Sequence, residues 1–449
     1  MPTPRIPPLL STYRGLRYPT SPLGSLEVFG RRAGETYEVY TGPSRGWALM
    51  TTDANLIDHV LRANHRNYGK SPIVTELLAS YIGTGLLTSE GDYWRRQRRL
   101  IQPGFSRERL AALVALIDAE AVAWVDGITD RSGTRPTDLY ATTLPLALQI
   151  MAQVLFSGSV TPAELHAIAR AVELGQEDFA RELRQPLLRP WRRLTNSRAE
   201  ADRQLAAALD VLLRHIEAHR AAPGGTYVDL MQMLLDARYD DGAAMSDRQL
   251  IDETLVLILA GHETTAISLA CTLHLLAAHP DWQRRVRAEW RAAFPDGTPA
   301  ADGLRQLPAL TAVLREGLRL YPPAYLVSRR ATADDRFGDT EVRAGQIVVS
   351  NVYGAHRNPR FFRDPLAFRP ERYLDRETNA NFAFGGGPRL CVGYHLAMME
   401  LQIAVGRLLD AARLAPSTTE GRDRLRFAGS ATLRPLGGVW VDLIADPTD

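Results

Sequence analysis

A single thiol lies in the glycine-rich stretch Phe384-Gly385-Gly386-Gly387-Pro388-Arg389-Leu390-Cys391-Val392-Gly393, directly before a helical pattern that extends to about Ala412. Glycine permits close backbone approach and positive φ angles. Free N–H groups and the positive end of a helix favour a sulfur anion, and the thiolate is the form that binds metals. An isolated cysteine is more often a small buried hydrophobic residue. The surroundings of Cys391 favour a metal ligand instead.

Composition describes a globular chain without a global charge bias. Of the 449 residues, 45% are hydrophobic and 23% charged, and 53 basic against 51 acidic residues leave a net charge of +2. This balance argues against a nucleic-acid-binding protein or one that binds anionic lipid through its overall charge. Length leaves the number of domains open, but no linker or repeat is visible. We expect one domain over residues 1–449.

The two cysteines, Cys271 and Cys391, form no CxxC pair, so the sequence predicts neither a disulfide framework nor a structural zinc site. The N-terminal segment Met1–Leu10 is interrupted by prolines and is too short for the apolar part of a signal peptide. No run approaches eighteen apolar residues. We expect a cytoplasmic protein without a membrane anchor.

Two segments begin like known motifs but do not complete them. Gly69-Lys70-Ser71 ends like a phosphate-binding P-loop, yet Asn64 stands where the earlier glycine belongs. His262-Glu263 begins like a zinc-protease helix, but the second histidine would fall at Ala266. We therefore exclude both a P-loop and this type of zinc site.

Helical periodicity dominates the chain. The pattern predicts helices over residues 106–126, 198–220, Ser246 to about Ala278, and Pro308 to Tyr321. The Ser246 helix starts with a capping box and is apolar nearly all round in its middle, which predicts burial. Short β-branched runs from Ala331 to Val352 predict a small sheet of hairpins. The fold class is therefore mainly α with a minor β part.

The cysteine loop resembles one known family. Phe384, Gly387, Arg389, Cys391 and Gly393 occupy every fixed position of the cysteine-ligand loop of cytochromes P-450. The resemblance implies the cytochrome P-450 fold and haem b as cofactor. It further implies that the Cys391 thiolate is the axial ligand of the iron, which favours O–O cleavage, and that Arg389 pairs with a haem propionate.

Further matches follow in the family's order. Glu316 and Arg319 share a helix face, and with Arg372 of the later arginine motif the resemblance implies a buried charge network. In Ala260–Thr265 the resemblance implies that Gly261 makes room for dioxygen and that the Thr264 hydroxyl hydrogen-bonds the oxygen bound to the iron. It also implies that Glu263 relays protons from solvent. Polar groups in a buried helix are costly unless they are used.

The helix around Trp94 carries another part of the resemblance. Trp94 and Arg98 lie four residues apart on one face, and the family directs this pair, together with Arg329, to the haem propionates. We predict that the neighbouring arginines point outward and steer an acidic redox partner, with solvation alone as the alternative. These arginines are Arg95, Arg96 and Arg99. His356 also lies in a family-like stretch, but we assign it no role.

The resemblance implies a monooxygenase that inserts one oxygen atom from dioxygen into a small hydrophobic substrate. Too little sequence follows Cys391 for a fused reductase, so we expect electrons from a separate ferredoxin or flavodoxin and its NAD(P)H-dependent reductase. We also expect the protein to be a monomer. One alternative is a peroxide-using or non-oxidative haem-thiolate enzyme, against which the Glu263-Thr264 pair argues. The other is a haem-based sensor or binding module, which would need no proton relay and which turnover with a surrogate reductase, dioxygen and hydrophobic substrates would distinguish.

Substrate identity is not readable from the sequence. The apolar content of the segments expected to contact substrate suggests a lipid-like, terpenoid or polyketide-like molecule. These segments are Ser71–Leu87, Leu174–Thr195, the helix face near Leu259, Tyr325-Leu326-Val327 and the turn at Ser430-Ala431.

Overall fold

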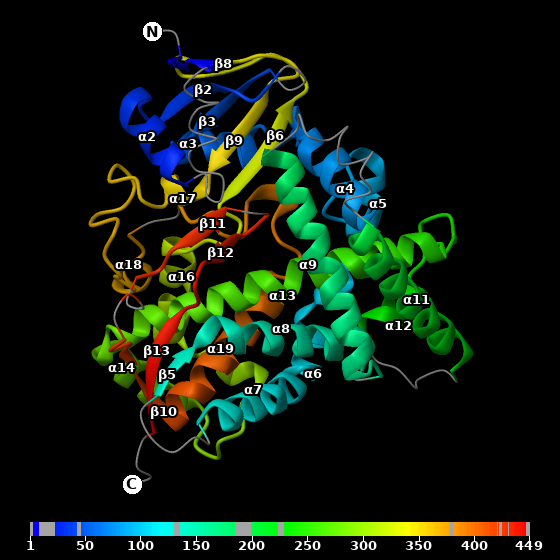
Figure 1. The fold of residues 1–449 in the computed structure, drawn as a ribbon, viewed down its shortest axis with the longest axis vertical. Coiled ribbons are helices and arrows are strands. Elements are labelled where there is room, and N and C mark those ends of the chain that lie inside the picture. Colours follow the sequence, from blue (N-terminus) through cyan, green and yellow to red (C-terminus); the bar gives the residue numbers. More distant parts are fainter. Residues whose placement is uncertain are drawn as a thin grey trace. The chain divides into compact units, whose positions relative to one another are not determined.

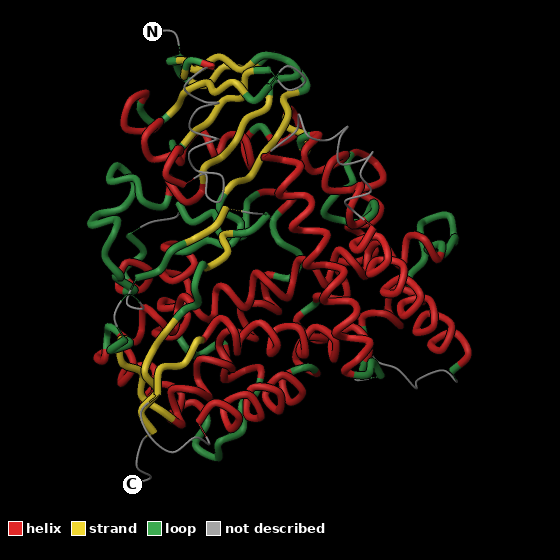
Figure 2. Tube along the Cα trace, viewed as in Figure 1, coloured by secondary structure: helices red, strands yellow, loops and turns green. Residues whose placement is uncertain are grey.

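The computed structural model describes residues 3–8, 23–42, 46–129, 135–157, 159–184, 199–222, 229–377, 380–419, 421, 424–429 and 431–445. Helices dominate it, as Figure 2 shows. Contacts divide the chain into two compact units: unit 1 comprises residues 1–71, 121–143 and 267–449, and unit 2 comprises residues 72–120 and 144–266. Three helices contribute residues to both: α7 (Val114–Thr129), α8 (Leu139–Phe156) and α13 (Asp247–Ala277).

The main sheet of unit 1 has six strands in the order β1-β2-β3-β9-β6-β4 (Figure 1). Pairs β1–β2 and β3–β9 are parallel, and the other neighbours are antiparallel. The strands are β1 (Arg5–Ile6), β2 (Thr36–Tyr40), β3 (Trp47–Thr51), β4 (Tyr68–Lys70), β6 (Leu326–Ala331) and β9 (Ile347–Asn351). The sheet expected over Ala331–Val352 is present, but early strands that the sequence did not predict join it, because pairing between distant segments leaves no local pattern in the sequence.

The remaining strands form smaller sheets in unit 1. One hairpin of the sheet predicted over Ala331–Val352 is confirmed at Gly338, whose φ of 58° is disfavoured for residues with a Cβ. These sheets contain β7 (Asp335–Phe337) with β8 (Thr340–Val342), β11 (Phe427–Gly429) with β12 (Leu433–Pro435), and β10 (Ala412–Pro416), β13 (Trp440–Ala445) and β5 (Arg135–Asp138) in the order β10-β13-β5.

Three helices of unit 1 pack against one another: α14 (Pro280–Ala293), α16 (Pro308–Leu320) and α19 (Tyr394–Ala411). Gly406 lets α19 approach α14, because a Cβ there would lie 2.1 Å from the Trp290 ring. Both α16 and α19 match the predicted helices. Shorter helices complete the unit: α2 (Leu23–Ala33), α3 (Ala54–Asp58), the π-helix η1 (His59–Ala63), η2 (His65–Asn67), α15 (Ala301–Leu304), α17 (Val352–Ala355), α18 (Glu371–Leu374) and η6 (Gly387–Arg389).

Unit 2 is built from helices, among which α9 (Pro162–Arg184) and α11 (Ala199–Ala221) pack together. The helix predicted over 106–126 is interrupted at Leu113. The helix predicted over 198–220 is confirmed by α11, apart from its first residue, Arg198, which lies outside the described residues. The others are η3 (Ile73–Leu78), α4 (Ala79–Ile82), α5 (Gly91–Ile101), η4 (Gln102–Phe105), α6 (Arg107–Ala112) and α12 (Leu230–Asp236).

Helix α13 begins with the predicted capping box: the Gln249 N–H donates to Ser246 Oγ at 3.3 Å, and the Ser246 N–H donates to Gln249 Oε1 at 2.9 Å. Among the described residues, α8 and α13 are long and apolar enough to cross a membrane, each with a mean hydropathy of 1.5. Of these apolar windows, 56% of α8 and 83% of α13 are buried inside the structure, as in core helices.

Candidate functional site

The Cys391 loop is held in shape by its own backbone. Gly385 and Gly387 have φ angles of 76° and 66°, and the Cys391 N–H donates to the Phe384 carbonyl at 3.1 Å. A Cβ at Gly387 would lie 2.1 Å from the carbonyl oxygen of Leu61. This position therefore requires glycine for both its conformation and its packing.

The two thiols of the chain have opposite environments. Cys271 is completely buried, and burial raises the pKa of its thiol. Cys391 is exposed, next to the exposed side chain of Leu390. Cysteine is normally among the most buried residues. An exposed thiol in a conformationally restricted loop therefore fits a sulfur atom that binds a metal or cofactor.

Two arginines expected at the cofactor connect to the short strand β4. Arg389 donates from NH1 to the Tyr68 carbonyl at 3.0 Å. Arg329 lies on β6 opposite Lys70 and is 9% exposed, and its NH1 donates to the Ser328 carbonyl at 3.0 Å. Within unit 1, the structure thus places both arginines next to one strand.

The predicted charge network of Glu316, Arg319 and Arg372 is confirmed. The Glu316 carboxylate accepts two hydrogen bonds of 2.8 Å from Arg319 and two of 3.1 Å from Nε of Arg372. All three side chains are at most 1% exposed. Arg319 also donates to the carbonyls of His356 and Pro365 at 2.6 and 2.7 Å. The remaining guanidinium donors therefore join the network to the loop that follows α17.

His356, to which the sequence assigned no role, connects this network to the segment before the cysteine loop. Its Nε2 accepts from the Phe382 N–H at 2.8 Å, so Nδ1 carries the proton and donates to the Arg319 carbonyl at 3.0 Å. Burial, together with the charge of Arg319, lowers the pKa of His356 to about 3. The imidazole is thus neutral and serves as a structural bridge. Only the Ala355–Arg357 stretch hinted at this residue.

In the middle of α13, three residues of the predicted oxygen groove are accessible, whereas their neighbours are buried. From Leu250 to Leu273, every residue is buried except Ala260, Gly261 and Thr264. Their spacing places the three on one helix face. The Thr264 hydroxyl donates to the Ala260 carbonyl at 2.6 Å.

Glu263 is buried and Gly261 packs against a second helix of unit 2. Glu263 is only 1% exposed. A Cβ at Gly261 would lie 2.5 Å from Sδ of Met151 on α8, so this glycine also serves helix packing. Sequence reasoning alone had missed the packing role.

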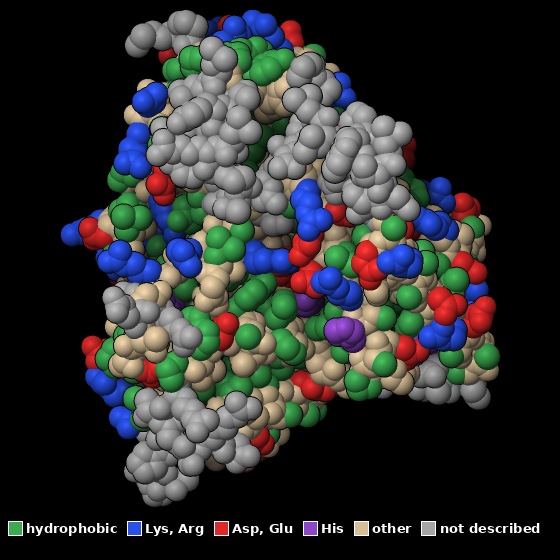
Figure 3. All heavy atoms as spheres, in the orientation of Figure 1, with side chains coloured by type: hydrophobic (Ala, Val, Ile, Leu, Met, Phe, Trp, Pro, Cys, Tyr) green, Lys and Arg blue, Asp and Glu red, His purple; other side chains and the backbone are tan. Residues whose placement is uncertain are grey.

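Helix α5 confirms the predicted exposure pattern but not the predicted positive field. Trp94 and Arg98 are partly exposed, whereas three neighbouring arginines are exposed. Each of these three pairs with an aspartate, which neutralises most of its charge at a distance. The pairs are Arg95 with Asp92, Arg96 with Asp241 at 3.2 Å, and Arg99 with Asp240. On the face drawn in Figure 3, acidic and basic side chains are likewise interspersed.

Comparison with known proteins matches residues 2–439 to the family model described as Cytochrome P450 (cytochrome P-450). The chain belongs to the cytochrome P-450 family. A cyclooctat-9-en-7-ol 5-monooxygenase of Streptomyces melanosporofaciens is 31% identical over 420 residues, which cover 91% of this chain and 88% of the relative. The cyclooctatin synthase of the same organism is 30% identical, covering 85% and 83% of the two chains. An 11-oxo-beta-amyrin 30-oxidase of Glycyrrhiza uralensis is 30% identical, covering 74% and 67%.

This cytochrome P-450 is therefore a monooxygenase, and its mainly helical architecture with small sheets agrees with the family fold. As a class, cytochromes P-450 use a haem-thiolate cofactor, dioxygen and a supply of electrons. The exposed Cys391 thiol fits that donor chemistry, as do the two arginines near β4.

Proposed function

We propose that this cytochrome P-450 hydroxylates or epoxidises a hydrophobic organic substrate, with haem b bound through the Cys391 thiolate. The observation that carries the proposal is the exposed thiol in a loop shaped by two glycines of positive φ and a backbone hydrogen bond. Because the family match extends through both units, we propose that residues 1–449 act as one domain.

Several residues would hold the cofactor besides Cys391. Arg389 and Arg329 supply guanidinium groups suited to carboxylates such as haem propionates. By the family pattern, Trp94 and Arg98 serve the same propionates, Phe384 belongs to the ligand loop and Gly261 makes room for dioxygen. The Phe384 ring lies edge-on to that of Tyr394, with centroids 4.7 Å apart, which limits its movement.

When bound, a haem-thiolate splits dioxygen with two electrons and two protons, transferring one oxygen atom to substrate and releasing the other as water. The buried part of α13 must supply those protons without admitting bulk water. Thr264 is a partly exposed hydroxyl, and Glu263 is a buried carboxyl next to it in sequence. We propose that Thr264 orients a proton at its Oγ1 and that Glu263 passes protons towards it.

We propose that the electrons come from a separate ferredoxin or flavodoxin and its NAD(P)H-dependent reductase, that the enzyme is a monomer and that it is cytoplasmic. The aspartate partners of the α5 arginines make an acidic docking partner less favourable there than the sequence suggested. Short-range contacts would then contribute more to docking than long-range steering.

The substrate class draws on the relatives. Two of their names specify oxidation at one numbered position, of cyclooctat-9-en-7-ol and of 11-oxo-beta-amyrin. We propose a terpenoid-like hydrophobic substrate oxidised at a single position. Tyr325 and the partly buried Leu326 belong to an apolar cluster of unit 1 with Phe427. Residues 185–195 and Ser430, also expected to contact substrate, lie outside the described residues.

The reaction itself is tested by reconstitution with a surrogate ferredoxin, its reductase, NADPH and isotopically labelled dioxygen, using a panel of terpenoid alcohols. We expect one labelled oxygen atom in each product, detected by mass spectrometry. Product formation with hydrogen peroxide but never with dioxygen and electrons would favour the peroxide-using alternative.

Thr264→Ala should leave haem content and substrate-induced spectral shifts near wild type, but lower the product formed per NADPH consumed. The physical reason is that α13 loses its accessible hydroxyl at the proposed proton-delivery position; such groups typically contribute about 10²–10⁴-fold to rate. Product and peroxide are measured together with NADPH consumption. Thr265→Ala, one residue along and buried, is the control. Unchanged product per electron in Thr264→Ala would show that the hydroxyl delivers no proton.

A further inference from the structure

The carboxylate of Asp335 collects three side-chain hydrogen bonds on one oxygen. Its Oδ2 accepts from Tyr68 OH at 2.6 Å, from His59 Nε2 at 2.8 Å and from Asn64 Nδ2 at 3.0 Å. The Arg336 N–H donates to the other oxygen at 2.9 Å. Burial alone would raise the pKa of Asp335, but the hydrogen bonds from Tyr68, His59 and Asn64 hold it at about 2. The group is therefore a carboxylate that only accepts.

The three donors come from two segments, and each segment supports the cysteine loop. His59 begins the π-helix η1, and Asn64 is its C-cap residue. Inside η1, the Leu61 carbonyl meets Gly387 so closely that no Cβ fits between them. Tyr68 belongs to β4, and its carbonyl accepts the hydrogen bond from Arg389. The loop thus rests on η1 and β4 at two of its residues.

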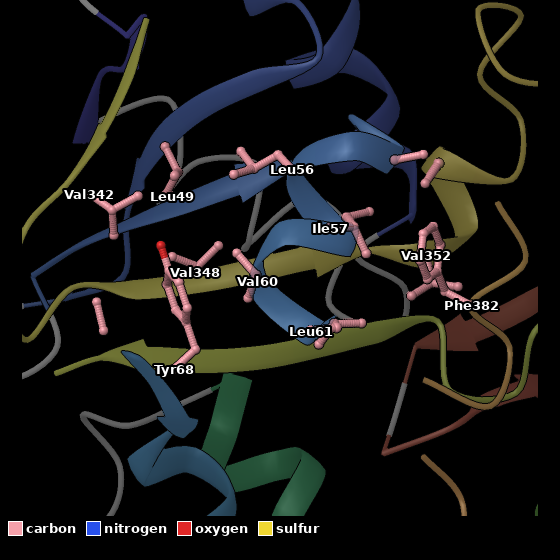
Figure 4. Close-up of a cluster of buried hydrophobic side chains, with 13 residues drawn as sticks. Leu49, Leu56, Ile57, Val60, Leu61, Tyr68, Val342, Val348, Val352 and Phe382 are labelled. Atoms are coloured by element: carbon pink, nitrogen blue, oxygen red, sulfur yellow. The ribbon is translucent and has the colours of Figure 1, made fainter. Parts of the chain in front are cut away.

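Neither segment is fixed by regular structure alone. Strand β4 has three residues and lies at the edge of the main sheet, where only β6 pairs with it. Helix η1 is a five-residue π-helix, a rare conformation that often marks functional sites. In Figure 4, Val60 and Leu61 of η1 lie in the same apolar cluster as Tyr68, Val348 and Phe382. In addition to this apolar packing, η1 and β4 are joined by their hydrogen bonds to the Asp335 carboxylate.

We propose that Asp335 is a positioning residue for the sulfur ligand. It ties together η1 and β4, which contact Gly387 and Arg389, and thereby fixes the turn that leads to Cys391. The inference rests on the proposed function only in taking Cys391 as that ligand. Loss of the carboxylate would release both η1 and β4 from Asp335, whereas loss of the Tyr68 hydroxyl would release only β4.

The test compares Asp335→Asn with Asp339→Asn in the purified holoprotein. Both substitutions remove one negative charge from the β7–β8 hairpin, but Asp339 is an exposed turn residue. Backbone hydrogen exchange is followed at Gly385, Leu390 and Cys391, whose N–H groups donate to carbonyls of Phe382, Gly387 and Phe384. In Asp335→Asn we expect about tenfold faster exchange at these amides, as for loss of a charged hydrogen bond, while α19 amides remain unchanged.

The second readout is the reduced carbon-monoxide spectrum during gentle warming. Asp335→Asn should lose its thiolate-type band earlier than Asp339→Asn, and Tyr68→Phe, which keeps the Tyr68 carbonyl, should lie between them. If Asp335→Asn does not fold, exchange at the same amides in Tyr68→Phe decides. Unchanged loop exchange, or a uniform increase throughout unit 1, would overturn the proposal. A wild-type protein without any thiolate band would instead contradict the proposed function.

Discussion

Cys391→Ala should abolish the strongly red-shifted Soret band of the reduced carbon-monoxide complex. That band requires an anionic sulfur on the iron, and the structure provides an exposed thiol at Cys391, next to a helix N-terminus that favours its thiolate form. The spectrum of purified, reduced, carbon-monoxide-treated protein is the measurement. Monooxygenase turnover should be lost together with the band.

Cys271→Ala is the matched control. Cys271 is fully buried in an apolar cluster with Ile267, Phe427 and Leu433 and has a raised pKa, so its thiol is unsuited to bind metal. This variant should keep the thiolate spectrum, with some loss of stability from the missing sulfur volume. A thiolate spectrum that survives in Cys391→Ala would exclude Cys391 as the ligand.

Glu316→Gln should strongly lower the free energy of unfolding. It leaves the buried guanidinium group of Arg319 with carbonyl acceptors, and that of Arg372 with carbonyl acceptors and the Glu377 carboxylate 4.0 Å away. Breaking such a buried ion pair costs about 3–5 kcal/mol, against a total stability of about 5–15 kcal/mol for a typical protein. We expect a large drop in the urea midpoint of unfolding, followed by circular dichroism, and a low yield of folded protein.

Glu371→Gln provides the comparison, because Glu371 is an exposed carboxylate adjacent to Arg372 in the chain. Its unfolding midpoint should stay within the range of ordinary surface substitutions, about 0.5 kcal/mol. If Glu316→Gln unfolded at the same urea concentration as Glu371→Gln, the network would contribute little to stability. The basis for the prediction would then be wrong.

Local patterns in the sequence determined the parts of this protein that depend on near neighbours in the chain. The loop glycines around Cys391 are needed where they stand, since positive φ angles occur at Gly385 and Gly387. The pair Glu316 and Arg319 shares a helix face by spacing alone, and the capping box at Ser246 places the start of α13. Each rests on backbone geometry within a few residues.

Contacts between distant segments were decided only by the tertiary structure. Strands β2 and β3 pair into a sheet with β9, nearly 300 residues later in sequence number. The aspartates that neutralise Arg96 and Arg99 come from the segment before α13. Asp335 gathers its donors from the η1–β4 region. A charged or polar side chain shows its type in the sequence but not its partner, because a hydrogen bond depends on approach within about 3 Å, which only the folded chain sets.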